Sequence, residues 1–288
     1  MTSRVPRVLV LLFAGLGLLG TGVSRAAEPH QRVEIVRREL VLGPEVREVI
    51  VANTFGAVTV RAGEPGRVSF AIRQTARSYR RESLEDAFLE ITLDVDEETT
   101  RLELMQAGPF TCVSDGGEFR GCGFDPDYEV SWDWEVLVPA GIDVEASNVN
   151  GGPLAIEGVT GRVKARNVNG AVRLEGLAGA VEASTVNGDL HAVMVRAPTG
   201  DSSFETLNGD VELVLPADTS AELGLRTRHG EIYTDFEFTT LPRRPTPTNG
   251  LASRYQYRLD PDLLVRIGAG GVRLYCGTLN GDIVVRAR

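Results

Sequence analysis

The feature that most constrains this chain is a short motif, an aliphatic residue followed by Asn-Gly, that recurs through its second half. Its asparagines are Asn150, Asn169, Asn187, Asn208 and Asn280, and the first four stand 19, 18 and 21 residues apart. A second turn signal of the form Gly-x-x-Gly lies about midway between successive copies. The chain must therefore turn about every nine or ten residues, a spacing that indicates short strands.

Two architectures satisfy this spacing. Asn-Gly is the preferred type I′ turn of a β-hairpin, so the repeats could form an antiparallel β meander or sandwich. Alternatively, each period of about 18–21 residues is one coil of a β-solenoid, with two strands per coil and equivalent residues stacked in columns.

Side-chain identity favours the solenoid, because only stacked coils bring equivalent positions into contact. One predicted column comprises Val149, Val168, Val186 and Leu207, and another comprises Leu154, Val172, Leu190, Val211 and Ile283. The five asparagines would form a structural ladder at the corner, since amide side chains hydrogen-bond to one another when stacked. We therefore predict an all-β fold with a short β-solenoid.

The chain divides near Pro139. Residues 27–138 alternate apolar and polar residues over longer stretches and predict an N-terminal β region, in which only residues 81–90 suit a short helix. Residues 139–288 hold the solenoid repeats. A degenerate copy places His229 in the Asn position, and the segment around Asn53 is a candidate early copy.

The first 26 residues predict a secretory signal peptide. Arg4 and Arg7 precede an apolar run of 12 residues from Val8 to Leu19, and small residues follow near Ala26. The run is shorter than the roughly 20 residues needed to span a bilayer, which disfavours a retained anchor. We expect an exported protein, either periplasmic or secreted to the cell surface, with no stable membrane insertion after cleavage.

Charge limits the partners. Residues 1–26 hold three Arg and no acid, so the rest of the chain carries 27 basic against 40 acidic residues. Such an excess disfavours nucleic acid as a partner. No cofactor is expected, and no metal, because the Cys lack metal-site spacing and His30, His191 and His229 fall in unrelated segments.

The three cysteines have different predicted roles. Cys112 and Cys122 are close in a Gly-rich loop, and in an oxidising compartment they predict a disulfide. Cys276 sits at strand spacing and is expected to be a small buried residue.

Catalytic residues are not apparent. Asp189, Asp210 and Asp282 each follow Asn-Gly, where an acid is best explained by the turn itself. The acidic turn containing Asp125, Asp127 and Glu129 is interpreted as solvated, with Ca²⁺ binding as the alternative. Nucleophile, metal-protease and phosphate-loop motifs are absent, so we expect no enzyme.

The repeated VNG block, preceded by VIVANTFGAVTVRAGEPGRVSF and closed by RIGAGGVRLYCGTLNGDIVVRA, resembles the adhesin family of bacterial envelope proteins, a domain of unknown function. The resemblance covers roughly residues 45–288. It implies a β-solenoid without assigned catalytic residues, and some members are tied to envelope-stress signalling. This chain departs from the pattern at two insertions, the Cys-bearing loop 106–127 and the Pro-rich segment 241–255.

The sequence therefore predicts a non-catalytic envelope protein that binds another envelope protein or a surface glycan. The candidate binding surface comprises Arg243, Arg244 and Arg254 of the Pro-rich segment with Trp132 and Trp134, which share one strand face. For the two Trp, covering the open end of the solenoid is the favoured role, and stacking against a sugar is the alternative. The alternative functions are a regulatory module in envelope-stress signalling and, less favoured, a polysaccharide-active enzyme.

Overall fold

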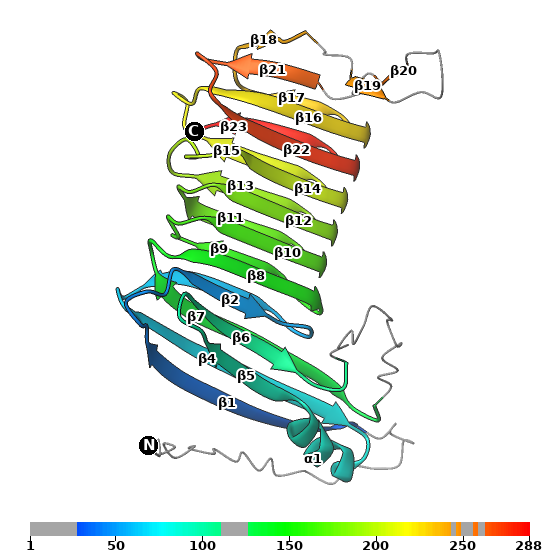
Figure 1. Ribbon diagram of the computed structural model, residues 1–288. Coiled ribbons are helices and arrows are strands. Elements are labelled where there is room, and N and C mark those ends of the chain that lie inside the picture. The colour runs from blue at the N-terminus through cyan, green and yellow to red at the C-terminus, as the bar shows by residue number, and fades with distance from the viewer. Residues whose placement is uncertain (1–27, 111–125, 243–245, 249–255, 259–262) are drawn as a thin grey trace.

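The computed structural model describes residues 28–110, 126–242, 246–248, 256–258 and 263–288. Within these ranges the chain forms two large sheets, one two-stranded sheet and one helix, α1 (Arg81–Glu90), in the segment where a helix was expected. Figure 1 shows strands stacked in successive layers along the molecule. The prediction of an all-β fold is confirmed.

Each large sheet has its own spatial order of strands. In that order, sheet A contains β1 (His30–Val41), β4 (Arg67–Ser78), β7 (Glu129–Pro139), β3 (Val58–Gly63), β9 (Leu154–Glu157), β11 (Val172–Leu177), β13 (Leu190–Met194), β15 (Val211–Leu215), β23 (Ile283–Ala287) and β17 (Ile232–Thr234). Sheet B contains β18 (Phe238–Thr240), β21 (Leu263–Ile267), β16 (Ala221–His229), β22 (Val272–Asn280), β14 (Ser202–Asn208), β12 (Val181–Asn187), β10 (Val163–Asn169), β8 (Asp143–Asn150), β2 (Glu48–Ala52), β6 (Arg101–Ala107) and β5 (Thr92–Glu97). The two-stranded sheet pairs β19 (Thr246–Thr248) with β20 (Gln256–Arg258).

The repeats form a solenoid and not a meander. Each coil places one strand in sheet B, turns at Asn-Gly, and places its next strand in sheet A. Equivalent strands pair in parallel, as where Val163 of β10 lies between Val144 of β8 and Val181 of β12. A hairpin turn would make consecutive strands antiparallel, so this pairing excludes the meander.

The strands on either side of residue 139 belong to the same two sheets. In sheet B, β2 pairs in parallel with β8, and in sheet A, β3 pairs in parallel with β9. The candidate early copy is thus a coil, but Asn53 aligns with Asn148, and Phe55 occupies the register of Asn150. The N-terminal β region continues the solenoid, and beyond β7 sheet A is extended by the antiparallel strands β4 and β1.

The spatial order of the coils differs from their order in the sequence. The coil β22–β23, last in the chain, lies between β14–β15 and β16–β17. Asn280 consequently neighbours Asn208 on one side and His229 on the other, so the coils do not stack in chain order at this point. The degenerate copy, with its three-residue β17, suits a position nearer the end, whereas the complete motif suits a position with neighbours on both sides.

The corner glycines explain why Gly follows every corner Asn. A Cβ placed on Gly170, Gly188 or Gly209 would lie 2.3, 2.4 or 2.2 Å from the carbonyl oxygen of the glycine one coil earlier, which is Gly152, Gly170 or Gly188 respectively. No side chain fits at such a separation from backbone. The repeated glycine is therefore required by the close stacking of one corner on the next.

A second polar column lies inside the corner, two residues before each Asn. Thr185 donates its hydroxyl hydrogen to the carbonyl oxygen of Gly170 at 2.9 Å, and Thr206 donates to that of Gly188 at 2.8 Å. Both threonines are buried, and each bond adds about 1 kcal/mol while satisfying a carbonyl that the corner removes from water. This column was not predicted from the sequence, and its members are Asn148, Asn167, Thr185, Thr206 and Thr278.

The corner stacking gives a first prediction. Gly188→Ala should lower the free energy of unfolding by about 1–3 kcal/mol or more, because the new methyl group meets backbone that cannot move aside. Gly141→Ala is the matched control, since a Cβ there has no heavy atom within 4 Å, and it should change stability by less than about 0.5 kcal/mol. Denaturant unfolding followed by circular dichroism measures both. Equal stability of the two variants would contradict the stacking argument.

The position of the coil β22–β23 between two coils that precede it in the sequence gives a second prediction. A chain ending at residue 241 loses β22–β23 and with it the parallel partners of β14, β15, β16 and β17. It also loses the fully buried side chains Leu274, Cys276, Ile283 and Val285. We expect this chain to aggregate or to unfold at markedly lower denaturant, as seen by size-exclusion chromatography and circular dichroism. An undiminished unfolding midpoint would show that the flanking coils can close the gap.

Candidate functional site

The five corner asparagines form one hydrogen-bonded column. The side-chain amide of Asn169 donates to Oδ1 of Asn150 at 2.8 Å, and the same bond links Asn187 to Asn169, Asn208 to Asn187 and Asn280 to Asn208 at 2.9, 2.9 and 2.7 Å. Every donor points toward the preceding member of the column. This arrangement ties successive corners together, which is a structural role.

The acids after Asn-Gly also serve the corner. Oδ1 of Asp189 accepts the backbone N–H of Asp210 at 3.0 Å, and Oδ1 of Asp210 accepts that of Asp282 at 2.8 Å. Oδ1 of Asp282 in turn accepts the N–H of Glu231 at 2.8 Å. These carboxylates hold the backbone of the neighbouring coil.

The two predicted aliphatic columns face opposite ways. The column from Leu154 to Ile283 is buried in the core, as its side chains are at most 1% exposed. The column of Val149, Val168, Val186 and Leu207 is 37–44% exposed and lies on the outside next to the corner. The repeated residue before Asn-Gly is therefore a surface position.

Trp132 and Trp134 are not part of a binding surface, which corrects the sequence-based assignment. They are only 3% and 1% exposed, and their rings lie 6.3 Å apart. The indole N–H of Trp134 donates to Oδ1 of Asn53 at 3.1 Å. Their strand, β7, lies between β3 and β4 in sheet A, and both side chains are on its inward face, so they enter the core and are unavailable for stacking on a sugar.

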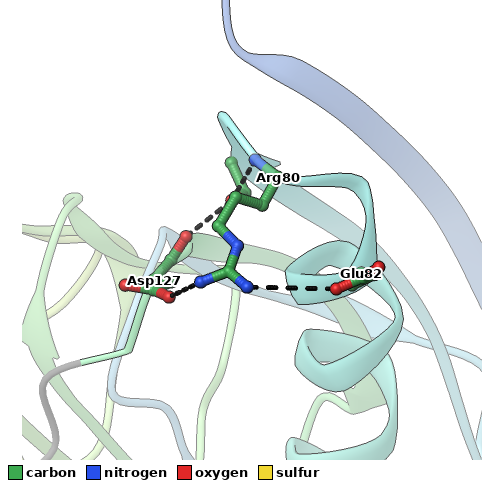
Figure 2. A network of polar contacts seen from close by, with 4 residues as sticks. Arg80, Glu82 and Asp127 are labelled. Carbon is green, nitrogen blue, oxygen red and sulfur yellow. Dashed lines mark hydrogen bonds and ion pairs between the residues drawn. The ribbon is translucent and has the colours of Figure 1, made fainter.

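Several predicted features lie outside the described residues: the signal peptide, the disulfide between Cys112 and Cys122, and the basic residues Arg243, Arg244 and Arg254. The acidic turn is described from residue 126 onward. Figure 2 shows the Asp127 carboxylate bound by Arg80, with Nη1 and Oδ2 2.9 Å apart. Ser78 donates to the Asp127 carbonyl at 2.6 Å and accepts the Arg80 N–H at 3.0 Å. These contacts attach the turn to the start of α1.

Within the described ranges, no group of three or more His, Cys, Asp or Glu side chains is placed to hold a metal ion. A helix of the length and apolarity required to cross a membrane is likewise absent from the part of the chain that the structure describes.

An open groove of about 700 Å³ crosses the outer face of sheet B near the beginnings of its strands. It extends from β2 and β8 across β10, β12 and β14 to β22. The side chains that give it its character are Glu145, Lys164, Glu182, Ser203, Arg273 and Tyr275. It is the strongest candidate site in the described structure, because charged, hydroxyl and aromatic groups converge there on one rigid sheet.

Ion pairs fix the charged groups of the groove. The Lys164 ammonium lies 2.8 Å from Glu145, and the Arg166 guanidinium beside the groove lies 2.7 Å from Glu182. Oδ1 of Asp201 accepts the backbone N–H of Arg273 at 2.8 Å. Acidic and basic side chains both line the groove, with carboxylates in excess, so the groove presents both signs in close proximity.

Tyr275 has a setting made by two glycines. It lies on β22 between Ser203 of β14 and Gly224 of β16. A Cβ on Gly224 would lie 3.2 Å from Cδ2 of the ring, and one on Gly277 would lie 2.9 Å from Cε1. The ring thus lies along the sheet surface in space that the glycines leave open. The sequence signal was available: Gly224 and Gly277 interrupt the alternation of two strands, which marks a close approach.

Cys276, the neighbour of Tyr275, points into the core. It is a free cysteine with 0% exposure, which confirms the expectation of a small buried residue. Burial raises the pKa of its thiol to about 12, because the apolar surroundings disfavour the thiolate.

Comparison with known proteins gives one family match. Residues 141–258 match the model of the family described as Toastrack DUF4097, a domain of unknown function. The matched segment begins at β8 and ends before the inserted coil β22–β23. A search of curated proteins finds no match.

Three solved structures resemble the fold distantly. A protein from Clostridium sporogenes, provisionally named a cell adhesion protein, is 9% identical, with 91% of this chain and 100% of that chain covered and a TM-score of 0.41. A provisionally named adhesin from Bacteroides fragilis is 10% identical, covering 88% and 97% of the chains, with a TM-score of 0.29. One from Parabacteroides merdae is 8% identical, covering 88% and 96%, with a TM-score of 0.22.

The setting of Cys276 predicts its reactivity. In the folded protein at mildly alkaline pH, the Cys276 peptide should remain unlabelled by iodoacetamide, because the thiol is buried and the thiolate is the reacting form. Labelling should become complete in denaturant. Peptide mass spectrometry before and after unfolding measures this, and rapid labelling of the folded chain would contradict the described position of β22.

Proposed function

We propose that this chain is a non-catalytic, adhesin-like binding protein of the bacterial envelope, and that the groove on sheet B is its binding site. The observation that carries the proposal is that four side chains of different chemistry line this one groove on a rigid sheet: Lys164, Glu182, Arg273 and Tyr275. The ligand is a polymer at the envelope, either a protein or a glycan.

The sheet beneath the groove supports binding because hydrogen bonds to neighbouring strands and corners restrain its backbone. The floor strands β10, β12 and β14 pair with parallel neighbours on both edges, and their corners are joined by the Asn and Thr columns. Side chains on such strands are positioned before the ligand arrives, which lowers the entropic cost of binding. An open trough across several strands suits an extended ligand better than a small molecule.

The predicted export of this chain supports the proposal that it acts at the bacterial envelope. The leader in residues 1–26 predicts secretion, and the acidic balance of the remaining chain suits a solvated exported protein. The resemblance of the repeats to the adhesin family of envelope proteins agrees with this assignment.

The proposal predicts retention of an envelope component by the groove. Residues 27–288 immobilised on beads should retain a specific protein or glycan from envelope extract, identified by mass spectrometry and sugar analysis. Ser203→Trp should abolish retention by filling the trough. Ala155→Trp on the outer face of sheet A is the matched control and should retain the component. Failure of the folded wild type to retain anything, or equal retention by both variants, would refute the proposed site.

A further inference from the structure

The side chains that line the groove indicate which class of ligand it binds. This inference about the ligand rests on the proposed function. Among the outward residues Glu145, Lys164, Glu182, Ser203 and Tyr275 on the strands that line the groove, Ser203 has the smallest side chain. Glu182 stands beside it on β12, and Tyr275 stands beside it on β22. Adjacent strands are about 4.8 Å apart, so the two flanking strands are about 9–10 Å apart across a floor that carries only a hydroxymethyl group. That opening suits one sugar ring.

The floor continues in small residues. Ala180, Gly200 and Ser202 line the groove together with Ser203, and none carries more than a methyl or hydroxymethyl group. Larger side chains stand around them: Lys164 and Glu182 on one side, Arg273 and Tyr275 on the other. The trough is therefore built by a difference in side-chain size across strands of one sheet.

Tyr275 supplies the aromatic group that the sequence had suggested in Trp132 and Trp134. Its ring lies along the sheet against Gly224 of β16 and Gly277 of its own strand, and Tyr275 lines the end of the groove at β22. Sugar rings present faces of C–H groups, which pack against aromatic rings, while their hydroxyl groups require polar partners around the rim. The groove supplies both an aromatic ring, that of Tyr275, and polar side chains that can hydrogen-bond with hydroxyl groups.

The charge of the groove favours a neutral ligand. Lys164 is neutralised by Glu145, and Glu182 is paired with Arg166. Five carboxylates line the groove (Glu48, Asp143, Glu145, Glu182 and Asp201) against three basic side chains (Arg162, Lys164 and Arg273). A polyanion would therefore meet net repulsion, and a polycation would still face Arg162 and Arg273. Hydroxyl groups of a neutral sugar suit such a mixed surface, because they donate hydrogen bonds to carboxylates and accept them from guanidinium groups.

A protein ligand fits less well. The central part of a protein interface is usually apolar and fully desolvated, with aromatic or aliphatic anchors. The floor of this trough is instead polar and small, and the exposed apolar column from Val149 to Leu207 lies at the opposite ends of the strands.

We propose that the sheet B groove binds a neutral glycan chain, with one sugar ring over Ser203 packed against Tyr275. The hydroxyl groups of that ring hydrogen-bond with Glu182, Ser203 and Arg273. The chain extends across β12 and β10 toward Lys164.

Isothermal titration of residues 27–288 with soluble neutral polysaccharides tests this inference. The probes are a β-glucan, a mannan and chitin oligosaccharides, with polygalacturonate as the anionic comparison. At least one neutral probe should bind, and polygalacturonate should bind at least about tenfold more weakly. Tyr275→Ala should weaken binding about ten- to a hundredfold, whereas Tyr275→Phe, which keeps the ring, should stay within about threefold.

The matched control is Tyr233→Ala, because Tyr233 is an exposed tyrosine on the outer face of sheet A. It should leave glycan affinity unchanged, and thermal unfolding should show that all variants are folded. Binding that survives Tyr275→Ala would refute the assignment of the site. Retention of an envelope protein without binding of any neutral probe would overturn the glycan inference and leave the proposed function standing. Retention of nothing from the envelope would refute the proposed function itself.

Discussion

The close stacking of one Asn-Gly corner on the next is the contact on which the rest of this structure depends. Backbone approaches backbone so closely there that only glycine fits, and the carbonyl it buries is satisfied by Thr185 or its equivalents from inside the corner. On the outside, the Asn column links each corner to the one before it. Because these contacts repeat in register, they fix the parallel pairing of both sheets. Register in turn decides which residues face outward, and so where a groove can form.

Much of the architecture was readable from the repeat because a periodic contact leaves a periodic sequence. The corner asparagines, the buried column through Leu190 and the short helix all follow from spacing and alternation. The order of the coils does not follow, because a repeat specifies what its neighbours look like and not which copy the neighbour is. The coil with Asn280 matches Asn208 as well as a consecutive coil would, so similarity alone left its insertion undetermined. Only one feature indicated the order: the copy at His229 matches the motif poorly, which suits a position nearer the end of the stack.

The site was harder to predict for a different reason. A groove on a sheet is made by differences between equivalent positions, such as Ser203 between Glu182 and Tyr275, whereas a search for repeats finds what those positions share. The tryptophans attracted attention as large aromatics, yet alternation in β7 places both on the inward face, where the core takes them. Tyr275 alternates the other way from Cys276 on the same strand and is therefore outward. The glycines beside it, Gly224 and Gly277, were the feature of the sequence from which its position could have been predicted.

This separation of roles bears on how such a scaffold acquires function. Inward positions fill the core, and the corner positions carry the Gly, Asn, Asp and Thr contacts that hold neighbouring coils. Substitution at either is costly, because it disturbs the coils above and below as well as its own. The outward positions toward the beginning of each strand, away from the Asn-Gly corner, carry no such burden, so they can differ from coil to coil with little loss of stability. Glu145, Lys164, Glu182, Ser203 and Tyr275 of the groove occupy such outward positions. Under the proposed function, a change of ligand there would require only a change of side-chain size and charge on a backbone that stays the same.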